Sequence, residues 1–229
     1  MIEFEGVSKI YSDSTTALEK IDLKIDDGEF IFVVGPTGAG KTTLLKLLIR
    51  QQIPTEGKIF IDSSEITSLP KKAIPSLRRR IGVVFQDFKL LPQKTVYENV
   101  SFPLEILGFP PEEIEEATGE ILKLISMEDK KDLFPNQISG GEGQKAAIAR
   151  AFVLKPEIIL ADEPTGNLDA KSGWEVMKLL SKLNELGSLV IMATHNVDIV
   201  STLPHRMVTI EEGKIIKDQR PKARKAQGV

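Results

Sequence analysis

The chain contains no cysteine among its 229 residues, so disulfide bonds and thiolate metal sites are excluded. This absence fits a reducing compartment. No apolar run approaches the ~20 residues that a membrane-spanning helix needs, and the first residues do not have the pattern of a signal peptide. The sequence also lacks internal repeats and low-complexity segments. We therefore expect a cytosolic protein.

The net charge is low, at -3 at pH 7, which argues against nucleic acid as a partner. Contents of 41% hydrophobic and 28% charged residues are those of an ordinary globular protein. Residues 217–229 differ, because they carry +4 and leave -7 for the rest of the chain. Residues 218–229 have few apolar side chains and are predicted to form a disordered basic tail. Its cations suit anionic lipid headgroups, and a tail that only aids solubility is an equal alternative.

The most informative stretch is a glycine-rich segment between an apolar run at 30–34 and a good helix former at 43–49. It fills the pattern G-x-x-x-x-G-K-[ST], which is typical of phosphate-binding loops. The segment consists of Gly35, Pro36, Thr37, Gly38, Ala39, Gly40, Lys41, Thr42 and Thr43.

Each part of this pattern has a chemical reason. Glycines let the backbone turn so that successive N–H groups point at phosphate oxygens. Lys41 supplies a charge for the β- and γ-phosphates, the Thr42 hydroxyl can ligate Mg²⁺, and the start of the next helix adds its partial positive charge. A glycine turn that binds nothing is the alternative, and the strand and helix on either side argue against it. The segment therefore predicts nucleotide binding with Mg²⁺.

Two carboxylates follow another apolar run, at 157–161. A parallel sheet would deliver Asp162 and Glu163 to the same edge as the phosphate loop. Because successive side chains alternate, Asp162 can hold Mg²⁺ through water while Glu163 can activate an attacking water as general base. Adjacent acids at a strand end are usually solvated loop charges, but the apolar run before them and the phosphate loop elsewhere favour the catalytic interpretation.

The order of apolar runs and helical patterns predicts an α/β fold. We expect a core that carries the phosphate loop, with an inserted α-helical subdomain. The chain is predicted to form one domain over 1–229, with the core at 1–87 and 157–217, the helical subdomain at 88–156 and the tail at 218–229.

A second glycine pair precedes a predicted helix at 144–154. Ser139, Gly140, Gly141 and Glu142 can form another backbone nest for an anion, or can simply cap the helix. Together with Ile138 before them and the run Ala147-Ile148-Ala149-Arg150-Ala151 after them, they resemble the signature motif of ATP-binding cassette (ABC) ATPases. The resemblance covers nearly the whole chain and implies that the nucleotide is ATP. It also implies an α/β fold with a P-loop NTPase (RecA-like) core, an antiparallel β subdomain and the inserted α-helical subdomain.

The resemblance also implies roles for residues that pattern alone leaves ambiguous. Tyr11 matches the aromatic that stacks on adenine, although packing is its other interpretation. Gln86 matches the glutamine that contacts Mg²⁺ or the attacking water, Asp169 belongs to the D-loop, and His195 matches the switch histidine that bonds the γ-phosphate. Outside this family, such a glutamine is often a solvated turn residue and such a histidine is often structural.

Members of the family close head to tail on ATP, so Ser139 to Gly141 of one subunit would contact the γ-phosphate on the other. An ATP-hydrolysing homodimer is therefore implied. ABC ATPases of DNA repair or ribosomes are another class, but they typically carry coiled-coil inserts or two cassettes, for which 229 residues leave no room. A regulator that binds ATP without hydrolysis is a further alternative, against which the intact Lys41, Asp162 and Glu163 argue.

Three segments, at 84–92, 95–100 and 162–169, resemble the FtsE group of bacterial cell-division ATPases. That group acts with the integral membrane protein FtsX to regulate cell-wall hydrolysis at the septum. The resemblance implies an FtsX-like partner and a place on the cytoplasmic face of the membrane. The close alternative is the ATPase of a lipoprotein-releasing or macrolide-type exporter, which shares 166–169.

Two local features lead to further expectations. Gly143 and Lys145 stand where ABC ATPases often carry glutamine and arginine, and the glycine is expected to loosen the first helical turn and lower turnover. Phe88 belongs to a cluster of apolar residues at 86–93, which we expect to be exposed and to dock the membrane partner. Folding of these residues onto the helical subdomain is the alternative.

Overall fold

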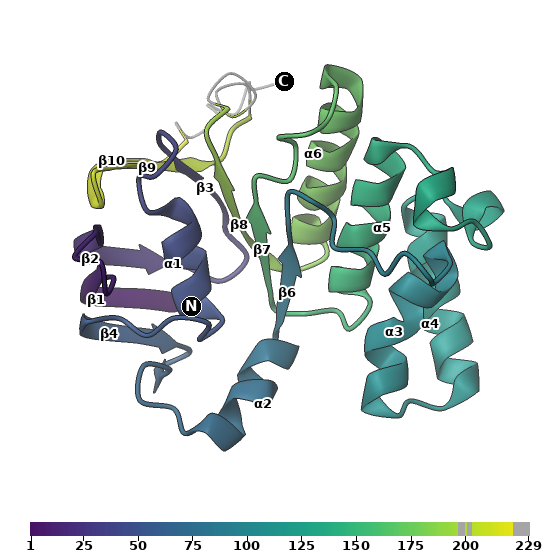
Figure 1. Ribbon diagram of the computed structural model, residues 1–229, viewed down its shortest axis with the longest axis horizontal. Helices are drawn as coiled ribbons and strands as arrows, with labels where there is room; N and C mark the ends of the chain where they lie inside the picture. Colours follow the sequence, from purple (N-terminus) through teal and green to yellow (C-terminus); the bar gives the residue numbers. More distant parts are fainter. Residues whose placement is uncertain (197–199, 201–202, 222–229) are drawn as a thin grey trace, which may run out of the picture. The chain divides into compact units, whose positions relative to one another are not determined.

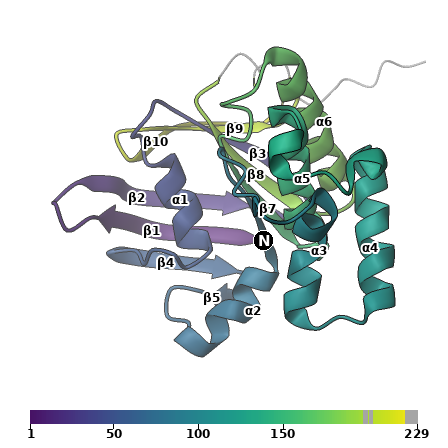
Figure 2. The same ribbon diagram turned by 45° about the vertical axis from the view of Figure 1, so that its right-hand side comes forward.

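The structure, a computed structural model, describes residues 1–196, 200 and 203–221. The chain forms two compact units, which are Met1–Thr67 with Ala193–Val229 and Ser68–Met192. Figures 1 and 2 label their helices and strands. None of the helices in the described ranges has the length and hydrophobicity of a membrane-spanning segment.

The first unit contains an antiparallel sheet with the strand order β2-β1-β4-β5. Its strands are β1 (Ile2–Ile10), β2 (Thr16–Ile25), β4 (Glu56–Ile61) and β5 (Ser64–Glu65). Buried and exposed side chains broadly alternate along β2, as in a strand that covers a core with one face. The pairing of β1 with β2 shifts register between Phe4 and Val7, where Gly6 has a φ of 55°. This sheet is the predicted antiparallel subdomain.

The same unit holds a second set of strands around the phosphate-loop segment. Strand β3 (Phe30–Val34) is buried along its whole length and runs parallel to β9 (Arg206–Glu211), which pairs antiparallel with β10 (Lys214–Gln219). Helix α1 (Lys41–Leu48) follows β3 after the loop and lies beside β1 and β2 in both views (Figures 1 and 2).

The second unit combines strands with most of the helices. Its strand order is β8-β7-β6, and β6 (Ile81–Val84) runs parallel to β7 (Ile158–Asp162). Strand β8 spans Leu189–Thr194, and its last two residues, Ala193 and Thr194, are assigned to the first unit. Its helices are α2 (Ile74–Arg79), α3 (Val96–Leu107), α4 (Pro111–Leu124), α5 (Gly140–Phe152) and α6 (Ala170–Glu185), with short 3-10 turns at Lys71–Ala73, Glu128–Lys130 and Pro135–Gln137. Residues 88–156 contain helices and no strands, as expected for an inserted helical subdomain.

Local sequence accounts for the ends of these helices. At the start of α3, Thr95 and Glu98 form a capping box, in which each side chain accepts a hydrogen bond from the other's backbone N–H. Gly108 ends α3 in the left-handed conformation, with a φ of 75°. Pro111 then occupies the first position of α4, where a missing N–H costs nothing.

Strand β10 corrects the predicted start of the tail. Asp218 and Gln219, which the composition places in the tail, belong to the sheet. The reason is the buried Arg206, whose Nε and Nη2 donate to the two carboxylate oxygens of Asp218 at 2.8 and 2.7 Å. Arg220 also contacts Asp26, at 3.4 Å. The rest of the predicted tail, 222–229, lies outside the described residues.

Candidate active site

The phosphate loop connects β3 to α1 within the first unit. Gly40 stands immediately before α1 with a φ of 105°, which favours glycine. A Cβ atom on Gly40 would lie 2.2 Å from the carbonyl oxygen of Ala17, and one on Gly35 would lie 2.0 Å from that of Ile210. No side chain fits at either position, so both glycines of the motif are needed for the loop to fold against its own unit.

Lys41 is buried, and its ammonium group is held by the loop itself. The Nζ atom donates to the carbonyl oxygens of Gly35 at 2.8 Å and Pro36 at 3.0 Å. The loop therefore curves around a positive charge, next to the first N–H groups of α1. Thr42 is exposed on the first turn of α1. This arrangement suits a phosphate chain with an associated cation.

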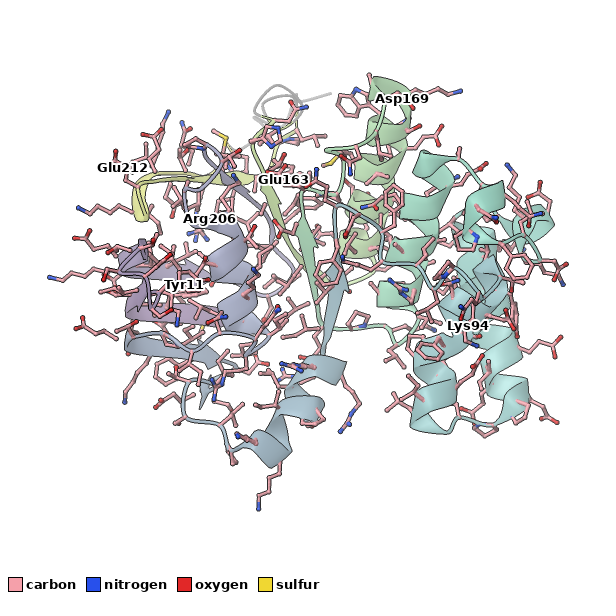
Figure 3. The ribbon with its side chains drawn as sticks, viewed as in Figure 1. Tyr11, Lys94, Glu163, Asp169, Arg206 and Glu212 are labelled. Carbon is pink, nitrogen blue, oxygen red and sulfur yellow. The ribbon has the colours of Figure 1, made fainter. Side chains whose placement is uncertain are left out.

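Tyr11 lies close to the first turn of α1 (Figure 3). Its hydroxyl is 3.2 Å from the Oγ1 atom of the buried Thr43. The Nζ atom of Lys9 lies over the tyrosine ring, 5.2 Å from its centroid. The structure thus links Tyr11 to the phosphate-loop helix, and its stacking on adenine stays a prediction.

His195 follows the last residue of β8 and is exposed. The strand end is fixed by Thr194, which is buried and accepts a hydrogen bond on Oγ1 from the N–H of Asn196 at 3.1 Å. The histidine is therefore delivered to solvent at a strand end, as its predicted contact with a γ-phosphate requires.

In the second unit, β7 ends at Asp162, and Glu163 turns the chain away from the strand. The φ of Glu163 is 50°, a left-handed conformation that is uncommon for residues other than glycine. The carbonyl oxygen of Glu163 accepts a hydrogen bond from the N–H of Gly166 at 3.0 Å, which closes the turn. Both carboxylates are half-buried. Strained backbone of this kind is common where side-chain direction matters for function.

Gln86 follows β6 and bonds to the D-loop within the same unit. Its Nε2 atom donates to Oδ1 of Asn167 at 3.2 Å, and Nδ2 of Asn167 donates to the carbonyl oxygen of Gln86 at 3.4 Å. A Cβ atom on Gly166 would lie 2.9 Å from the Gln86 amide nitrogen. The structure therefore brings together the segments after β6 and after β7, which the sequence predicts only as separate motifs.

The signature residues form the start of α5. Ser139 and Glu142 make a capping box: the Ser139 hydroxyl accepts from the Glu142 N–H at 3.4 Å, and the Glu142 carboxylate accepts from the Ser139 N–H at 2.9 Å. Lys130 forms an ion pair with the same carboxylate. The hydrogen bond from Lys130 and the backbone bond from Ser139 lower the pKa of Glu142 to about 2. Glu142 is therefore ionised at neutral pH and fixes the first turn of α5.

The start of α6 lies against the signature. A Cβ atom on Gly141 would lie 2.8 Å from the Oγ atom of Ser172. Ser172 in turn donates to Asp169, from its N–H at 3.0 Å and from its hydroxyl at 2.7 Å, and these bonds lower the pKa of Asp169. Asp169 thus caps α6 beside the signature (Figure 3). The sequence predicts it as a nucleotide contact and misses this structural role.

The segment 86–93 is less exposed than predicted. The ring of Phe88 is half-buried and lies over the start of α5, 3.2 Å from the place of a Cβ atom on Gly143. Phe88 therefore folds onto the helical part of the unit, the alternative that the sequence left open. Phe85 is the exposed aromatic here, with 37% of its surface accessible.

Lys130 is the functional-site residue that the sequence does not reveal. It lies 12 residues before Glu142 in a short 3-10 turn, Glu128–Lys130, and no motif marks it. Only the path of the chain between α4 and α5 brings its ammonium group to the signature carboxylate. A lysine in a run of acidic and basic residues usually carries a solvated charge, so the sequence gives no sign of this contact.

A Mg²⁺ ion fits the oxygen donors that the motifs supply. Among the described residues, no three His, Cys, Asp or Glu side chains form a metal-binding group. Mg²⁺ does not need such a group, because it is usually held by one or two carboxylates, water and substrate phosphates. Thr42, Gln86 and Asp162 offer a hydroxyl, an amide and a carboxylate oxygen. These donors suit a cation that arrives with a nucleotide.

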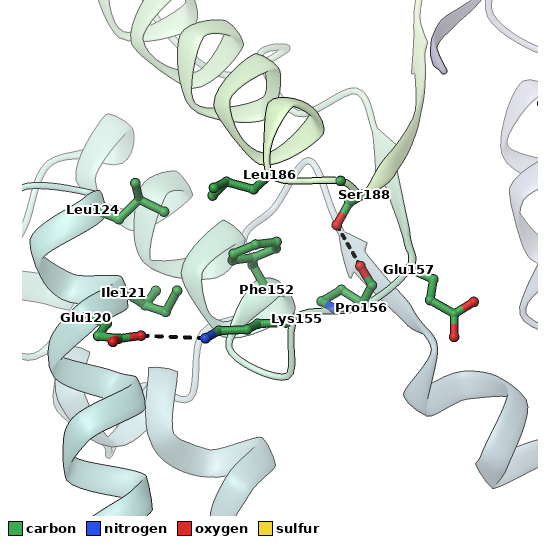
Figure 4. A pocket seen from close by; sticks show the side chains of 10 residues that line it. Glu120, Ile121, Leu124, Phe152, Lys155, Pro156, Glu157, Leu186 and Ser188 are labelled. Carbon is green, nitrogen blue, oxygen red and sulfur yellow. Dashed lines mark hydrogen bonds and ion pairs between the residues drawn. The ribbon is translucent and has the colours of Figure 1, made fainter. Parts of the chain in front are cut away.

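A pocket of about 470 Å³ lies elsewhere in the second unit (Figure 4). It is lined by apolar side chains, including Phe152 and Leu186, and by residues just before β7 and β8. Two of its lining residues, Lys155 and Glu120, form an ion pair at 3.6 Å. Ligands of parallel sheets bind at the opposite, carboxyl ends of strands. This pocket is therefore not the nucleotide site.

Comparison with known proteins gives matches over nearly the whole chain. A family model described as "ABC transporter" matches residues 18–166. The cell division ATP-binding protein FtsE of Bacillus subtilis is 48% identical over 96% of both chains, and that of Streptococcus pneumoniae is 45% identical over 96% of this chain and 95% of its own. A solved ATP-binding cassette, described as a dimer in a post-hydrolysis state bound to ADP and Pi, is 37% identical with a TM-score of 0.86, covering 96% of this chain and 98% of that one.

Proposed function

Since the chain belongs to the ABC transporter family of ATP-binding proteins, we propose that it is the ATP-hydrolysing subunit of an FtsE-type cell-division complex. The chain is an ATPase, and the reaction is the hydrolysis of ATP to ADP and phosphate. Support for the division role comes from the two relatives above, which carry the cell-division name and match this chain over almost their full length. An exporter ATPase is the alternative that the shared motif at 166–169 allows.

The observation that carries this function is the phosphate loop wound around Lys41. The loop has two glycines that admit no Cβ atom, a lysine held by loop carbonyls and the start of a helix. The chemistry of these groups fits the β- and γ-phosphates of ATP. Of the charged side chains in the first unit, Lys41 is the one that this loop encloses. Tyr11 supplies a flat ring for adenine next to it.

The remaining motifs supply the hydrolytic groups. Thr42, Gln86 and Asp162 would hold a Mg²⁺ ion, which would neutralise phosphate charge. Glu163 accepts a proton from the attacking water, so that the resulting hydroxide bonds to the γ-phosphorus and the bond to the ADP oxygen breaks. His195 donates a hydrogen bond to the γ-phosphate and orients it for this attack.

Two copies act together in this proposal. Ser139, Gly140 and Gly141 of one subunit contact the γ-phosphate bound to the other, and Glu142 and Asp169 fix these contacts from within the signature's own subunit. Support comes from the capped, exposed start of α5 and from the solved cassette, which is dimeric. ATP therefore closes the homodimer, and hydrolysis opens it.

An FtsX-like integral membrane protein is the proposed partner, and it holds the subunit at the cytoplasmic face of the membrane. The predicted docking surface is 86–93; because Phe88 is turned inward, we propose that the outer side of this segment docks the partner together with the exposed Phe85. The last residues, 222–229, carry three cations that suit anionic lipid. Co-sedimentation with anionic liposomes, with and without 222–229, tests this contact; equal binding would remove it.

The experiment that tests hydrolysis replaces Glu163 by glutamine. Glu163→Gln keeps the shape of the side chain but removes the base, so we expect phosphate release to fall by ~10²–10⁴-fold while ATP still binds. Because product does not form, the variant accumulates as the ATP-bound dimer, which light scattering after gel filtration measures. A variant that hydrolyses ATP at the wild-type rate would exclude Glu163 as the base.

Glu212 offers a matched control. It is also a glutamate in the left-handed conformation, with a φ of 47°, but it lies exposed in the turn between β9 and β10 (Figure 3). Glu212→Gln is expected to leave phosphate release unchanged. An equal loss in both variants would mean that the effect comes from charge or folding and not from a catalytic base.

A further inference from the structure

Phe88 sits in a hollow that the glycines of α5 provide. A Cβ atom on Gly143 would lie 3.2 Å from Cδ2 and 3.4 Å from Cε2 of the Phe88 ring, and one on Gly140 would lie 3.8 Å from Cζ. The ring therefore covers the first turn of α5 at close packing distance, and a side chain at Gly143 would have to displace it. We call this contact of Phe88 with Gly140 and Gly143 the Phe88 socket.

The backbone on either side of the socket is held by two side chains of α5, those of Arg150 and Gln144. Arg150 donates from Nη2 to the carbonyl oxygen of Phe88 at 3.0 Å and from Nη1 to that of Lys89 at 2.7 Å. Gln144, which is fully buried, donates to the carbonyl oxygen of Phe85 at 3.4 Å. Phe88 and Lys89 both have a positive φ, of 59° and 50°. Such conformations persist where neighbouring groups fix them, and here Arg150 binds both carbonyls.

The segment fixed in this way contains Gln86. Gln86 lies two residues before Phe88 in the sequence. Its side chain donates a hydrogen bond to Asn167 in the D-loop. The opposite wall of the socket is the backbone of the signature helix, which begins at Gly140. One aromatic ring thus joins the segment that carries Gln86 to the turn that presents Ser139. Movement of either segment must move the ring or open the socket.

We propose that Phe88 is a positioning residue for hydrolysis, and that Gly143 lets its ring pack closely on α5, where a side chain would press on the ring. This inference rests on the proposed roles of Gln86 and Ser139 in ATP hydrolysis. It also gives a physical reason for Gly143, which the sequence alone marks only as a weak helix former. The glycine that should loosen the turn is instead covered by an aromatic ring.

The test is a double-mutant cycle of Phe88→Ala and Gly143→Ala. Alanine normally stabilises a helix relative to glycine. With Phe88 present, Gly143→Ala crowds the ring, so the melting temperature is expected not to rise. With Phe88→Ala, the same change is expected to raise it by about 2 °C or more. Equal shifts in both backgrounds would mean that the two positions do not interact, and would overturn the socket.

Steady-state kinetics test the positioning role. Phe88→Ala is expected to lower kcat for ATP hydrolysis by about 5- to 100-fold, with KM changed less than about twofold, because Gln86 is misplaced while the phosphate loop is intact. Phe88→Leu, which keeps an apolar side chain over α5 and lowers the risk of unfolding, is expected to recover kcat to within about threefold of wild type. A wild-type kcat in Phe88→Ala would overturn the positioning role.

Phe60 in β4 is the matched control, because it is also a half-buried phenylalanine but lies in the other unit. Phe60→Ala is expected to change the melting temperature while leaving kcat within about twofold. An equal loss of kcat in Phe60→Ala would mean that lost packing alone explains the Phe88 result. The melting cycle needs no nucleotide, so it still tests the socket if wild-type protein fails to hydrolyse ATP and the proposed function falls.

Discussion

The carboxylate of Glu142 accepts hydrogen bonds from two different groups. Its carboxylate receives the Ser139 N–H that would otherwise be unpaired before α5, and the Lys130 ammonium group from a separate turn. The first contact is local and follows from the spacing of serine and glutamate in the motif. The second depends on the tertiary fold. The residue therefore fastens a neighbouring turn to the signature and keeps the Ser139 backbone in place.

This arrangement predicts a defined pH dependence. Lys130 and the Ser139 N–H hold the pKa of Glu142 at about 2 in the folded protein, below its ordinary value of 4.5. The unfolded chain therefore binds the proton more readily, so the stabilisation is complete above pH ~4.5 and is lost as the pH falls toward 2. Glu142→Gln is expected to lower the free energy of unfolding by about 1–2 kcal/mol at pH 7, and by less at pH 3. Urea unfolding at both pH values measures this.

The exposed pair of Lys182 and Glu185 serves as the control, because both side chains are more than half accessible. Glu185→Gln is expected to change the free energy of unfolding by less than about 0.5 kcal/mol at either pH. If Glu142→Gln has the same small effect, the Lys130 contact does not stabilise the signature turn.

At the scale of elements, prediction succeeded where the pattern was continuous and failed at ends that pairing decides. The apolar strand β3 lies at the run 30–34 that the sequence marks, because burial along its whole length leaves a clear pattern. The polar ends of β4 and β10 give no such pattern. Glu56 joins β4 by pairing with Ser8, and Gln219 joins β10 by pairing with Met207, and neither partner is visible from local sequence.

The edge strand β10 depends on a single buried cation. The Arg206 guanidinium bonds Asp218 twice, Glu29 at 2.9 Å and the carbonyl oxygen of Lys24 at 2.7 Å. Its hydrogen bonds lower the pKa of Asp218. Arg206→Met keeps a long apolar side chain but leaves two carboxylates without their cation, so we expect a loss of about 2–4 kcal/mol of unfolding free energy. Thermal or urea unfolding measures it.

Two further variants make this prediction specific. Adding Asp218→Asn to Arg206→Met removes one uncompensated charge and is expected to recover part of the loss. Arg220→Ala, which removes an exposed cation that contacts Asp26, is expected to cost less than about 0.5 kcal/mol. If Arg206→Met costs no more than Arg220→Ala, the buried network does not hold β10.

At the scale of the whole molecule, the sequence predicts the fold class, whereas the division into compact units depends on contacts that a local pattern does not show. The predicted helical insertion starts at 88, whereas the second unit starts at Ser68 and includes β6 and β7. One reason is a close backbone approach: a Cβ atom on Gly82 in β6 would lie 2.4 Å from the carbonyl oxygen of Ala151 in α5. A glycine in an apolar strand gives no sign of its neighbour. The predicted start of the insertion at 88 therefore stays a prediction.

The proposed dimer makes a prediction about mixtures of inactive proteins. Lys41→Met removes the phosphate-loop charge of its own subunit, and Ser139→Arg blocks the signature that serves the other subunit. Each variant alone is expected to be inactive. In a mixed dimer, one site combines both defects and the other combines the intact loop of one chain with the intact signature of the other. Random pairing of equal amounts makes half of the dimers mixed, so activity is expected to return to about a quarter of wild type.

A second mixture separates this geometry from simple stabilisation of one variant by the other. Lys41→Met and Glu163→Gln both affect the nucleotide bound to their own subunit, so each site of their mixed dimer keeps one defect. Phosphate release from this mixture is expected to stay at the level of the single variants. Recovery in both mixtures, or in neither although mixed dimers form, would contradict a head-to-tail dimer whose two sites are each built from one loop and the opposite signature.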